Sequence, residues 1–286
     1  MIRKLSPFFA LFLLLGAAGP LAAAGLRFEL GFGWTLVAPR LNATYISQYA
    51  PPLVPQDLYV ASSATQTVHF NGKTSYGFNG FFNLLFTDNI GFQVLADYHR
   101  PGIGGENAPY EGQVQFLDYN DAVRTEELSS PWPNSAGNLA ETTFSFNALA
   151  RFRLTDNLDL SVSAGPTIFN FEGKAGYIGY TELELVLGDL EYTLTGMTYQ
   201  TVVALDPQTK YGFNLGVEAA YEFMRHVILA LDLRWYEAPS ANVQMHIVDD
   251  DIYPVPVEQI EQSIGLGQLT IDPSYMRVGL AIRFIF

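Results

Sequence analysis

The sequence predicts an all-β protein, an up-and-down antiparallel barrel of eight strands that crosses a membrane. Three observations predict it. Apolar and polar residues alternate with a period of two, tight turns alternate with long connecting segments, and aromatic residues mark both ends of the alternating segments. Side chains on a strand point alternately to its two faces. In a membrane barrel the apolar face meets lipid and the polar face lines the lumen.

Composition narrows the chemistry that this chain can perform. It has 286 residues, a formal net charge of -14, 14% aromatic residues and no cysteine. Without cysteine there is no disulfide, thiolate metal site, cysteine nucleophile or lipid-bearing cysteine. Binding to nucleic-acid phosphates requires clustered Lys and Arg, which an acidic chain does not favour. We therefore expect no nucleic-acid partner, and the sequence indicates no cofactor and no metal site.

Residues 1–24 are predicted to be a signal peptide, which leaves 25–286 as one barrel domain with four long extracellular loops. Arg3 and Lys4 precede an apolar run over residues 8–18, and Ala22-Ala23-Ala24 offers a cleavage site. The run is shorter than the roughly 20 residues of a membrane helix, and no later segment reaches about 18 uninterrupted apolar residues. An exported chain of this kind is either soluble or a barrel.

The first strands follow from alternation on both sides of a turn. A strand is predicted over residues 26–38, and a connecting segment rich in proline follows over 39–73. Strands over 76–86 and 90–98 then form a hairpin around Thr87-Asp88-Asn89, because outward apolar residues alternate with small, polar and some apolar ones in both segments. A second connecting segment covers residues 100–141.

The same hairpin pattern recurs twice before the last strand. Strands over 144–154 and 158–164 flank Thr155-Asp156-Asn157, and strands over 211–223 and 227–235 flank Met224-Arg225-His226. The remaining connections cover 171–210 and 237–273, and the closing strand covers 274–286. In each tight turn the flanking outward residues are four positions apart. That spacing fits a three-residue turn whose last residue is left-handed, here Asn89, Asn157 and His226.

Aromatic residues fall at both ends of the outward faces, where a membrane barrel carries its aromatic girdles. Strands of roughly 10 to 12 residues also suit a tilted crossing of the hydrocarbon core. At the end of the long connections the ring consists of Trp34, Tyr76, Tyr98, Phe144, Tyr211 and Trp235. At the end of the tight turns it consists of Phe28, Phe86, Phe92, Phe152, Phe223 and Phe286.

The segment over 182–194 leaves the strand number open between eight and ten. It alternates on both sides of Gly188-Asp189, so it is either a hairpin that projects above the membrane or two further membrane strands. In a ten-stranded barrel Glu182, Glu184 and Glu191 would face the lumen and unbalance its charge. We therefore favour eight strands with a projecting hairpin.

The inward faces carry equal numbers of opposite charges. An eight-stranded barrel is just wide enough for side chains to fill it, and buried charges persist only when they are paired and hydrogen-bonded. The sequence therefore predicts an interlocked ion-pair network that fills the lumen, with a narrow path for ions or small solutes as the rival. The twelve members are Arg27, Glu29, Asp97, Arg151, Arg153, Asp159, Glu218, Glu222, Asp232, Arg234, Arg277 and Arg283.

The closing strand adds a resemblance to a known family. Its outward residues run from Val278 to the aromatic Phe286 at the end of the chain. Together with the paired strands and tight turns, this resembles the small OmpA/OmpX-type barrels of bacterial outer membranes. The resemblance implies a multi-pass protein in the Gram-negative outer membrane, surrounded by outer-membrane lipid. It also implies that periplasmic chaperones and the barrel assembly machinery handle the chain, reading an assembly signal that comprises Gly279, Ile282, Phe284 and Phe286.

No activity is specified by a motif. We expect a barrel without catalytic residues that supports membrane integrity or makes surface contacts through acidic loops, with an unidentified surface ligand. Residues 237–273 contain seven acidic residues and no Lys or Arg, and residues 100–141 contain seven against Arg100 and Arg124. The rivals are a narrow channel and a lipid-modifying enzyme. For an enzyme, only His99 lies near the outer mouth of the lumen with Asp97 on the same strand, and spacing indicates no nucleophile.

Overall fold

The computed structural model describes residues 26–49, 59–105, 110–117, 122–130, 135–187, 190–250, 261 and 267–286. The predicted signal peptide lies outside these residues. Among them no helix is long and apolar enough to cross a membrane. The strands are β1 (Arg27–Pro39), β2 (Asn42–Tyr49), β3 (Tyr59–Gly72), β4 (Ser75–Leu85), β5 (Ile90–His99), β6 (Gly102–Gly105), β7 (Tyr110–Leu117), β8 (Val123–Ser130), β9 (Ser135–Arg153), β10 (Leu158–Leu187), β11 (Leu190–Met224), β12 (Val227–Glu237), β13 (Ala241–Asp250), β14 (Gln268–Ile271) and β15 (Tyr275–Ile285).

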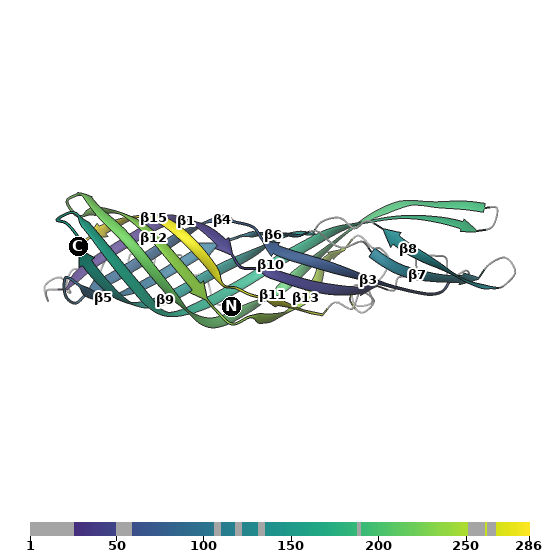
Figure 1. Ribbon diagram of the computed structural model, residues 1–286, viewed down its shortest axis with the longest axis horizontal. Coiled ribbons are helices and arrows are strands. Elements are labelled where there is room, and N and C mark those ends of the chain that lie inside the picture. Colours follow the sequence, from purple (N-terminus) through teal and green to yellow (C-terminus); the bar gives the residue numbers. More distant parts are fainter. Residues whose placement is uncertain are drawn as a thin grey trace.

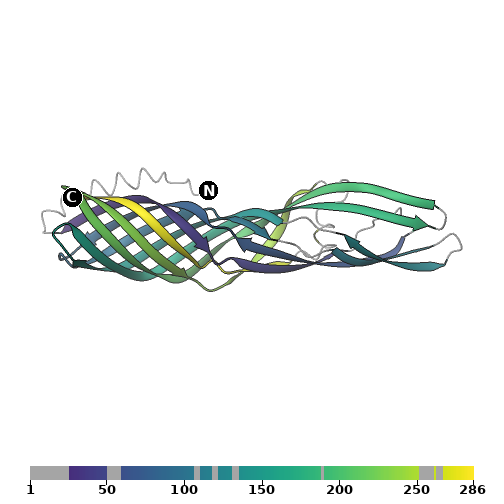
Figure 2. The same cartoon turned by 45° about the horizontal axis from the view of Figure 1, so that its top comes forward.

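Eight of these strands close a barrel. The first strand, β1, pairs with the last, β15, on one side and with β4 on the other. The circuit continues through β5, β9, β10, β11 and β12 and returns to β15, with every pair antiparallel. The eight-stranded barrel is confirmed. Residues 183–187 and 190–194 pair with each other in a hairpin beyond the barrel, so the ten-stranded alternative is wrong (Figures 1 and 2).

The three tight turns lie where they are predicted, but only one has the predicted backbone. His226 has a φ of 70° and is the one non-glycine residue with positive φ in the described part of the chain. Asn89 and Asn157 are therefore not left-handed. Threonine closes these turns instead: Thr87 Oγ1 accepts hydrogen bonds from the backbone N–H of Asn89 at 3.3 Å and of Ile90 at 3.0 Å. The Asn89 side chain donates to the Arg151 carbonyl at 2.8 Å and so ties its turn to β9.

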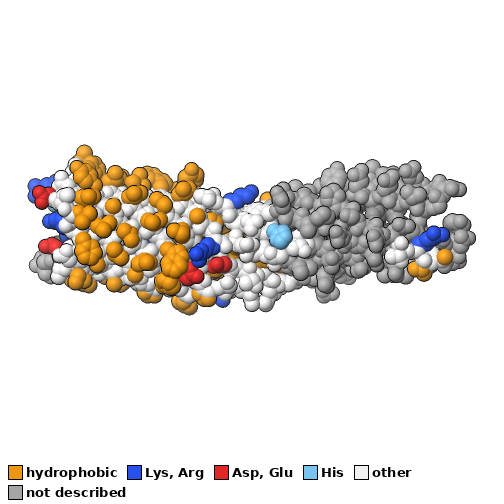
Figure 3. Space-filling view, viewed as in Figure 1, with side chains coloured by type: hydrophobic (Ala, Val, Ile, Leu, Met, Phe, Trp, Pro, Cys, Tyr) orange, Lys and Arg blue, Asp and Glu red, His pale blue; other side chains and the backbone are white. Residues whose placement is uncertain are grey.

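The predicted alternation places apolar side chains on the outside of the barrel. Trp34 and Tyr76 are 60% and 84% exposed, whereas the inward Arg277 and Arg283 are at most 1% exposed. Figure 3 shows a broad band of hydrophobic side chains over the barrel, with charged side chains at its two ends. Phe28 is the exception in the predicted aromatic rings, because it is buried with its ring 5.5 Å from that of Phe82.

Among the residues that the structure describes, the four long connections are mostly paired strand rather than irregular loop. β10 and β11 run for 30 and 35 residues, far more than the roughly 9 to 11 that a membrane strand needs. β2 pairs with β3, β3 with β6 and β7, β7 with β8, and β13 with both β11 and β14. Sequences such as SSATQT in β3 are polar on both faces, so strand formation leaves no period-two signal there.

The part of the molecule beyond the barrel has a hydrophobic core of its own. We call this part the extension: β2, β3, β6, β13, β14 and the adjoining ends of β9, β10 and β11. Figure 1 shows these strands continuing along the barrel's long axis. The buried residues that form its core are Leu41, Ala43, Phe70, Ile103, Leu139, Phe171, Ala175, Val203, Leu205, Ala241, Val243, Met245, Leu269 and Ile271.

Candidate functional site

The inside of the barrel near its tight turns is organised around one carboxylate. Glu29 on β1 is fully buried, and both its oxygens accept hydrogen bonds from the Arg151 guanidinium on β9, at 2.7 and 2.6 Å. Arg27 Nη2 and Arg283 Nε lie 3.1 and 3.4 Å from the same carboxylate. Arg283 Nη1 also donates to Glu218 at 2.6 Å. Paired charges therefore join β1, β9, β11 and β15 across the lumen.

A second group of charges lies toward the extension. Arg277 on β15 bridges two acids, with its Nε 3.0 Å from Asp97 and its Nη2 2.8 Å from Asp232. The Tyr236 hydroxyl donates a hydrogen bond to Asp97. Arg234 Nη2 lies 3.4 Å from Asp232. All five side chains are buried, so each charge depends on its partners rather than on water.

Neutral side chains connect the two charged groups. Asn83 donates to Glu29 at 3.0 Å and accepts from Gln93 at 3.1 Å. Gln93 accepts from Asn147 at 3.0 Å, and Asn147 accepts from Asn214 at 2.7 Å. Asn214 accepts in turn from Arg234, whose guanidinium leads to Asp232. One continuous chain of hydrogen bonds thus runs through the lumen, and we call the whole set the lumen network.

Close packing inside the lumen network requires a glycine at position 216. A Cβ added there would lie 2.5 Å from both Cζ and Nη2 of Arg234. Gly216 and Arg234 are directly paired on β11 and β12. The missing side chain therefore gives the guanidinium room to lie across the neighbouring strand and reach Asn214.

An aromatic layer separates the lumen network from the core of the extension. The rings of Tyr236 and Tyr275 stack at 4.3 Å, and Phe169 meets them edge-on at 6.2 and 6.4 Å. The Tyr275 hydroxyl forms a 3.0 Å hydrogen bond with Thr143. All three rings are fully buried. The three rings belong to a buried apolar cluster that also includes Phe81 and Leu95 of the barrel, so this layer packs directly on the barrel interior.

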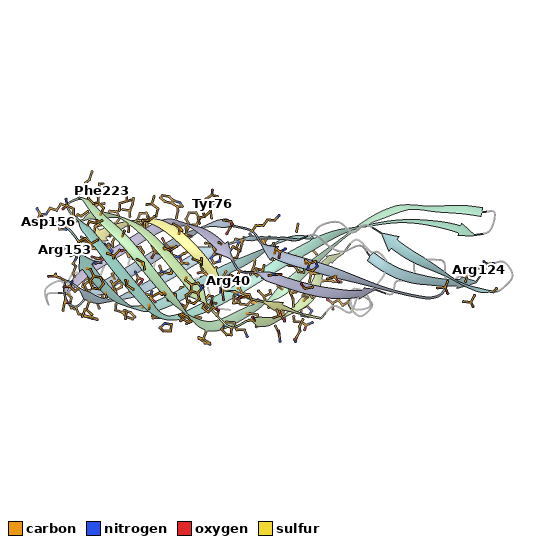
Figure 4. All side chains as sticks on the ribbon, in the orientation of Figure 1. Arg40, Tyr76, Arg124, Arg153, Asp156 and Phe223 are labelled. Carbon is orange, nitrogen blue, oxygen red and sulfur yellow. The ribbon has the colours of Figure 1, made fainter. Side chains whose placement is uncertain are left out.

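The predicted lumen residues divide into those that belong to the two charged groups and three that lie beside the tight turns outside these groups. Nine of the twelve belong to the two charged groups described above. Arg153 and Asp159 form a looser pair, 3.6 Å apart, with the Arg153 side chain 59% exposed. Glu222 forms no ion pair within the described residues, and its carboxylate accepts from the His226 backbone N–H at 3.3 Å. Glu222 pairs with the buried Ile228 and so lies on the inward face, in the last regular pair before the register shift beside the turn. Figure 4 shows Arg153, Asp156 and Phe223 at this end of the barrel.

Sequence reasoning missed a buried pair at the opposite end of the barrel. His99 Nε2 lies 3.4 Å from a Glu141 oxygen, with both side chains at most 3% exposed, and the His99 ring lies 4.4 Å from Tyr275. Glu141 was expected in a loop, but it is inward on β9. Its inward position could have been predicted, because Glu141 is two and four residues from the inward Thr143 and Ser145 on the same strand. The predicted ion-pair network leaves out the neutral Asn and Gln members, because a balance of charges does not count them.

The residues of the predicted assembly signal lie on the closing strand, and their role stays a prediction. Ile282 and Phe284 pair with Phe32 and Leu30 of β1, and Gly279 pairs with Thr35. Phe286 is half exposed, and its backbone N–H donates to the Phe28 carbonyl at 2.9 Å. Over the described residues, no group of three or more His, Cys, Asp or Glu side chains is arranged to hold a metal ion.

Comparisons with known proteins give structural similarity without sequence similarity. No family model matches the chain, and no curated protein matches it. Among solved structures, OprG from Pseudomonas aeruginosa has a TM-score of 0.46 at 10% identity, covering 91% of this chain and 95% of that one. The protease OmpT from Escherichia coli has a TM-score of 0.37 at 10% identity, with coverage of 91% and 96%. Ail from Yersinia pestis has 0.34 at 10% identity, with coverage of 91% and 99%. All three scores lie below 0.5, and the fold assignment rests on the strand pairing itself.

Proposed function

We propose that this protein is a bacterial outer-membrane barrel with a closed lumen, which anchors a rigid extension for contacts at the cell surface and supports the integrity of the membrane. The apolar band around a closed ring of strands supports the membrane location, because only a closed barrel lets strands cross lipid without unpaired backbone groups. The predicted signal peptide is consistent with export.

The observation that carries the proposal is the lumen network. Its hydrogen bonds run from Glu29 through the amide side chains to Asp232 and Arg277, and the rings of Tyr236 and Tyr275 lie beyond them. Moving an ion through this region would require several buried ion pairs to separate, and each such separation leaves an uncompensated charge. A filled interior of this kind suits an anchor better than a conduit.

The extension supports the surface-contact part of the proposal. Its hydrophobic core makes it a folded unit with a fixed shape rather than a set of loops, and β10 and β11 carry it well beyond the barrel.

We also propose that the barrel has no enzymatic activity. His99, the histidine nearest the outer mouth, is 1% exposed and packed against Tyr275, so no substrate reaches it. Lipid turnover that His99→Ala abolishes would contradict this part.

Conductance across a planar bilayer tests the closed lumen. We expect the inserted wild-type protein to give no reproducible ion steps. Insertion is established in the same preparation by protection of the barrel from added protease. Clear steps from a correctly inserted barrel would favour the narrow channel instead.

Removing the hairpin formed by residues 183–187 and 190–194 tests surface contact separately from membrane integrity. In a variant with residues 183–194 replaced by a short turn, the barrel and the extension core remain intact. We expect cells carrying it to keep wild-type resistance to detergent but to lose adhesion to surfaces or partner cells. Unchanged adhesion would restrict the role to membrane integrity.

A further inference from the structure

Three of the exterior cations lie close together although the chain as a whole has a net charge of -14. Lys73 follows β3, Arg100 follows β5, and Lys174 lies on β10, so three distant parts of the sequence contribute one each. All three side chains are exposed. We call these three residues, together with Asn138, the basic patch.

Strand pairing places the members of the basic patch in one row. The Lys73 backbone N–H donates to the Gly102 carbonyl at 2.8 Å, and a Cβ on Gly102 would lie 3.8 Å from Lys73 Cδ. Gly102 pairs with Asn138, which pairs with Lys174. Directly paired residues share a face of the sheet. At about 4.8 Å per strand, the two lysines are roughly 14 Å apart along this row.

Arg100 fills the space between the lysines. Its Nε donates to Asn138 Oδ1 at 2.8 Å, which fixes the guanidinium over the middle of the row. Neither Lys73 nor Lys174 forms an ion pair with any described residue, and Arg100 forms none either. Arg40, by contrast, is neutralised by Glu237 at 3.1 Å. The cations of the basic patch are therefore available to an external anion.

Two carboxylates limit the basic patch, Glu172 on the side of the barrel and Asp206 on the side of β11. Glu172 lies two residues before Lys174 on the same face of β10, and Asp206 lies on β11 two residues after Ala204, the partner of Lys174. Asp206 is 3.6 Å from His246 on the neighbouring strand. The positive charge is thus concentrated over β6 and β9, around Arg100 and Asn138.

The basic patch begins directly beyond the aromatic ring. Tyr98 precedes Arg100 by two residues and Tyr76 follows Lys73 by three, and both tyrosines are exposed, Tyr76 to 84%. Figure 4 shows Tyr76 at the boundary between barrel and extension. At about 3.3 Å per residue, Arg100 and Lys73 lie roughly 7 to 10 Å beyond the rings along their strands. Lys174 lies about 13 Å beyond Asn170, which is in the same row as Tyr98. Lipid headgroups occupy the first several ångströms outside the hydrocarbon core, so Arg100 and Lys73 are at that layer and Lys174 is at its outer edge.

We infer that Lys73, Arg100 and Lys174 bind the phosphate of an anionic lipid in the outer leaflet, whose acyl chains lie along the apolar wall below Tyr98. The inference rests on the proposed membrane location. Arg100 supplies a planar fork of donors for phosphate, and the lysines supply point charges on either side. A bound lipid would hold the barrel at a fixed depth and couple the extension to the membrane surface.

Lipid titration of the detergent-solubilised protein, followed by native mass spectrometry, tests this inference. The probes are phosphatidylglycerol and phosphatidylcholine with identical acyl chains. The patch variant carries Lys73→Gln, Arg100→Gln and Lys174→Gln. The matched control carries Arg40→Gln, Arg124→Gln and Lys210→Gln, which removes the same charge from other positions.

We expect the wild type and the control to retain phosphatidylglycerol in preference to phosphatidylcholine. In the patch variant the half-saturating concentration of phosphatidylglycerol should rise at least tenfold and up to about a hundredfold, since each cation near an anionic lipid contributes about 1 kcal/mol. Equal loss in both variants, or no loss in the patch variant, would overturn the inference. Displacement of the lipid by an equal concentration of inorganic phosphate would also overturn it, because the site would then be one for free anions.

Insertion into phosphatidylcholine vesicles, measured first on the same samples, separates the two proposals. A wild-type protein that fails to insert contradicts the membrane location. If the wild type inserts normally but the patch variant and the control bind phosphatidylglycerol equally well, only the lipid site is contradicted.

Discussion

The barrel and the extension are built from the same continuous strands but have opposite polarity. In the barrel part of β9, Asn147 and Arg151 are buried inside while Phe144 is exposed outside. Farther along the same strand, the apolar Leu139 is inside and the polar Asn138 is outside. β10 changes in the same way, from Ser161 inside the barrel to Phe171 inside the extension.

This reversal shows which solvent surrounds each region. A strand in water buries its apolar face, whereas a barrel strand in lipid exposes that face and keeps polar groups in its lumen. The aromatic residues Trp34, Tyr76 and Tyr98 lie at the level where the polarity reverses. The boundary between the lipid-facing barrel and the extension can therefore be located from side-chain burial alone.

The largest effect is expected from removing the central carboxylate of the barrel. Glu29→Ala leaves the buried Arg151 and Arg283 without their shared partner, and breaking a buried ion pair costs about 4 kcal/mol. Urea unfolding in detergent, followed by tryptophan fluorescence, measures the loss. A change no larger than that of a surface substitution would show that the lumen network does not stabilise the barrel.

The extension should respond to a cavity rather than to a lost charge. Phe171→Ala removes a buried ring from its core and should cost about 3 kcal/mol. The loss should appear as faster proteolysis of the extension while the barrel keeps its resistance to unfolding. Equal loss of stability in both regions would contradict the division into two cores.

A charge on the lipid face should be tolerated far less than one on the outer face of the extension. Leu280→Arg lies at the middle of β15 on the exposed apolar face and should cost about 2 kcal/mol or more in a bilayer. Asn242→Arg, on the exposed face of β13, is the matched control and should fold like the wild type. Equal effects of the two substitutions would remove the distinction between lipid-facing and water-facing surfaces.

The smallest effect is expected at the loose ion pair near the tight turns. Arg153 lies 3.6 Å from Asp159 and is mostly exposed, so Arg153→Ala should cost less than about 1 kcal/mol. The same urea titration measures it beside Glu29→Ala. A loss as large as that of Glu29→Ala would show that burial does not determine how much these ion pairs contribute to stability.

The sequence was sufficient to predict the barrel because lipid imposes a strict alternation on every strand that crosses it. Residues such as Leu280 and Arg283 must lie on opposite faces, and the strand boundaries and tight turns follow from that requirement. The extension could not be predicted in the same way. In water, β2 and β3 are free to carry polar residues on both faces, so their alternation is weak, and these strands were expected to be loops.

The lumen network was only partly predictable for a related reason. Charge balance identified Glu29, Arg151 and Arg277, since an unpaired charge inside a barrel is costly. It gave no weight to Asn147 or Asn214, which carry no charge but join the two charged groups. Such connections depend on which strands lie side by side, and Asn147 and Asn214 meet only because β9 and β11 both border β10.

The most direct test of the account uses the absence of cysteine from the chain, which allows single cysteine labels. Spin labels at Leu280 and Asn242 are compared for collision with oxygen, which partitions into lipid, and with a water-soluble nickel complex. The account predicts that oxygen relaxes the Leu280 label more strongly and that nickel relaxes the Asn242 label more strongly. Strong relaxation of the Leu280 label by nickel would place the apolar wall of the barrel in water and contradict the account.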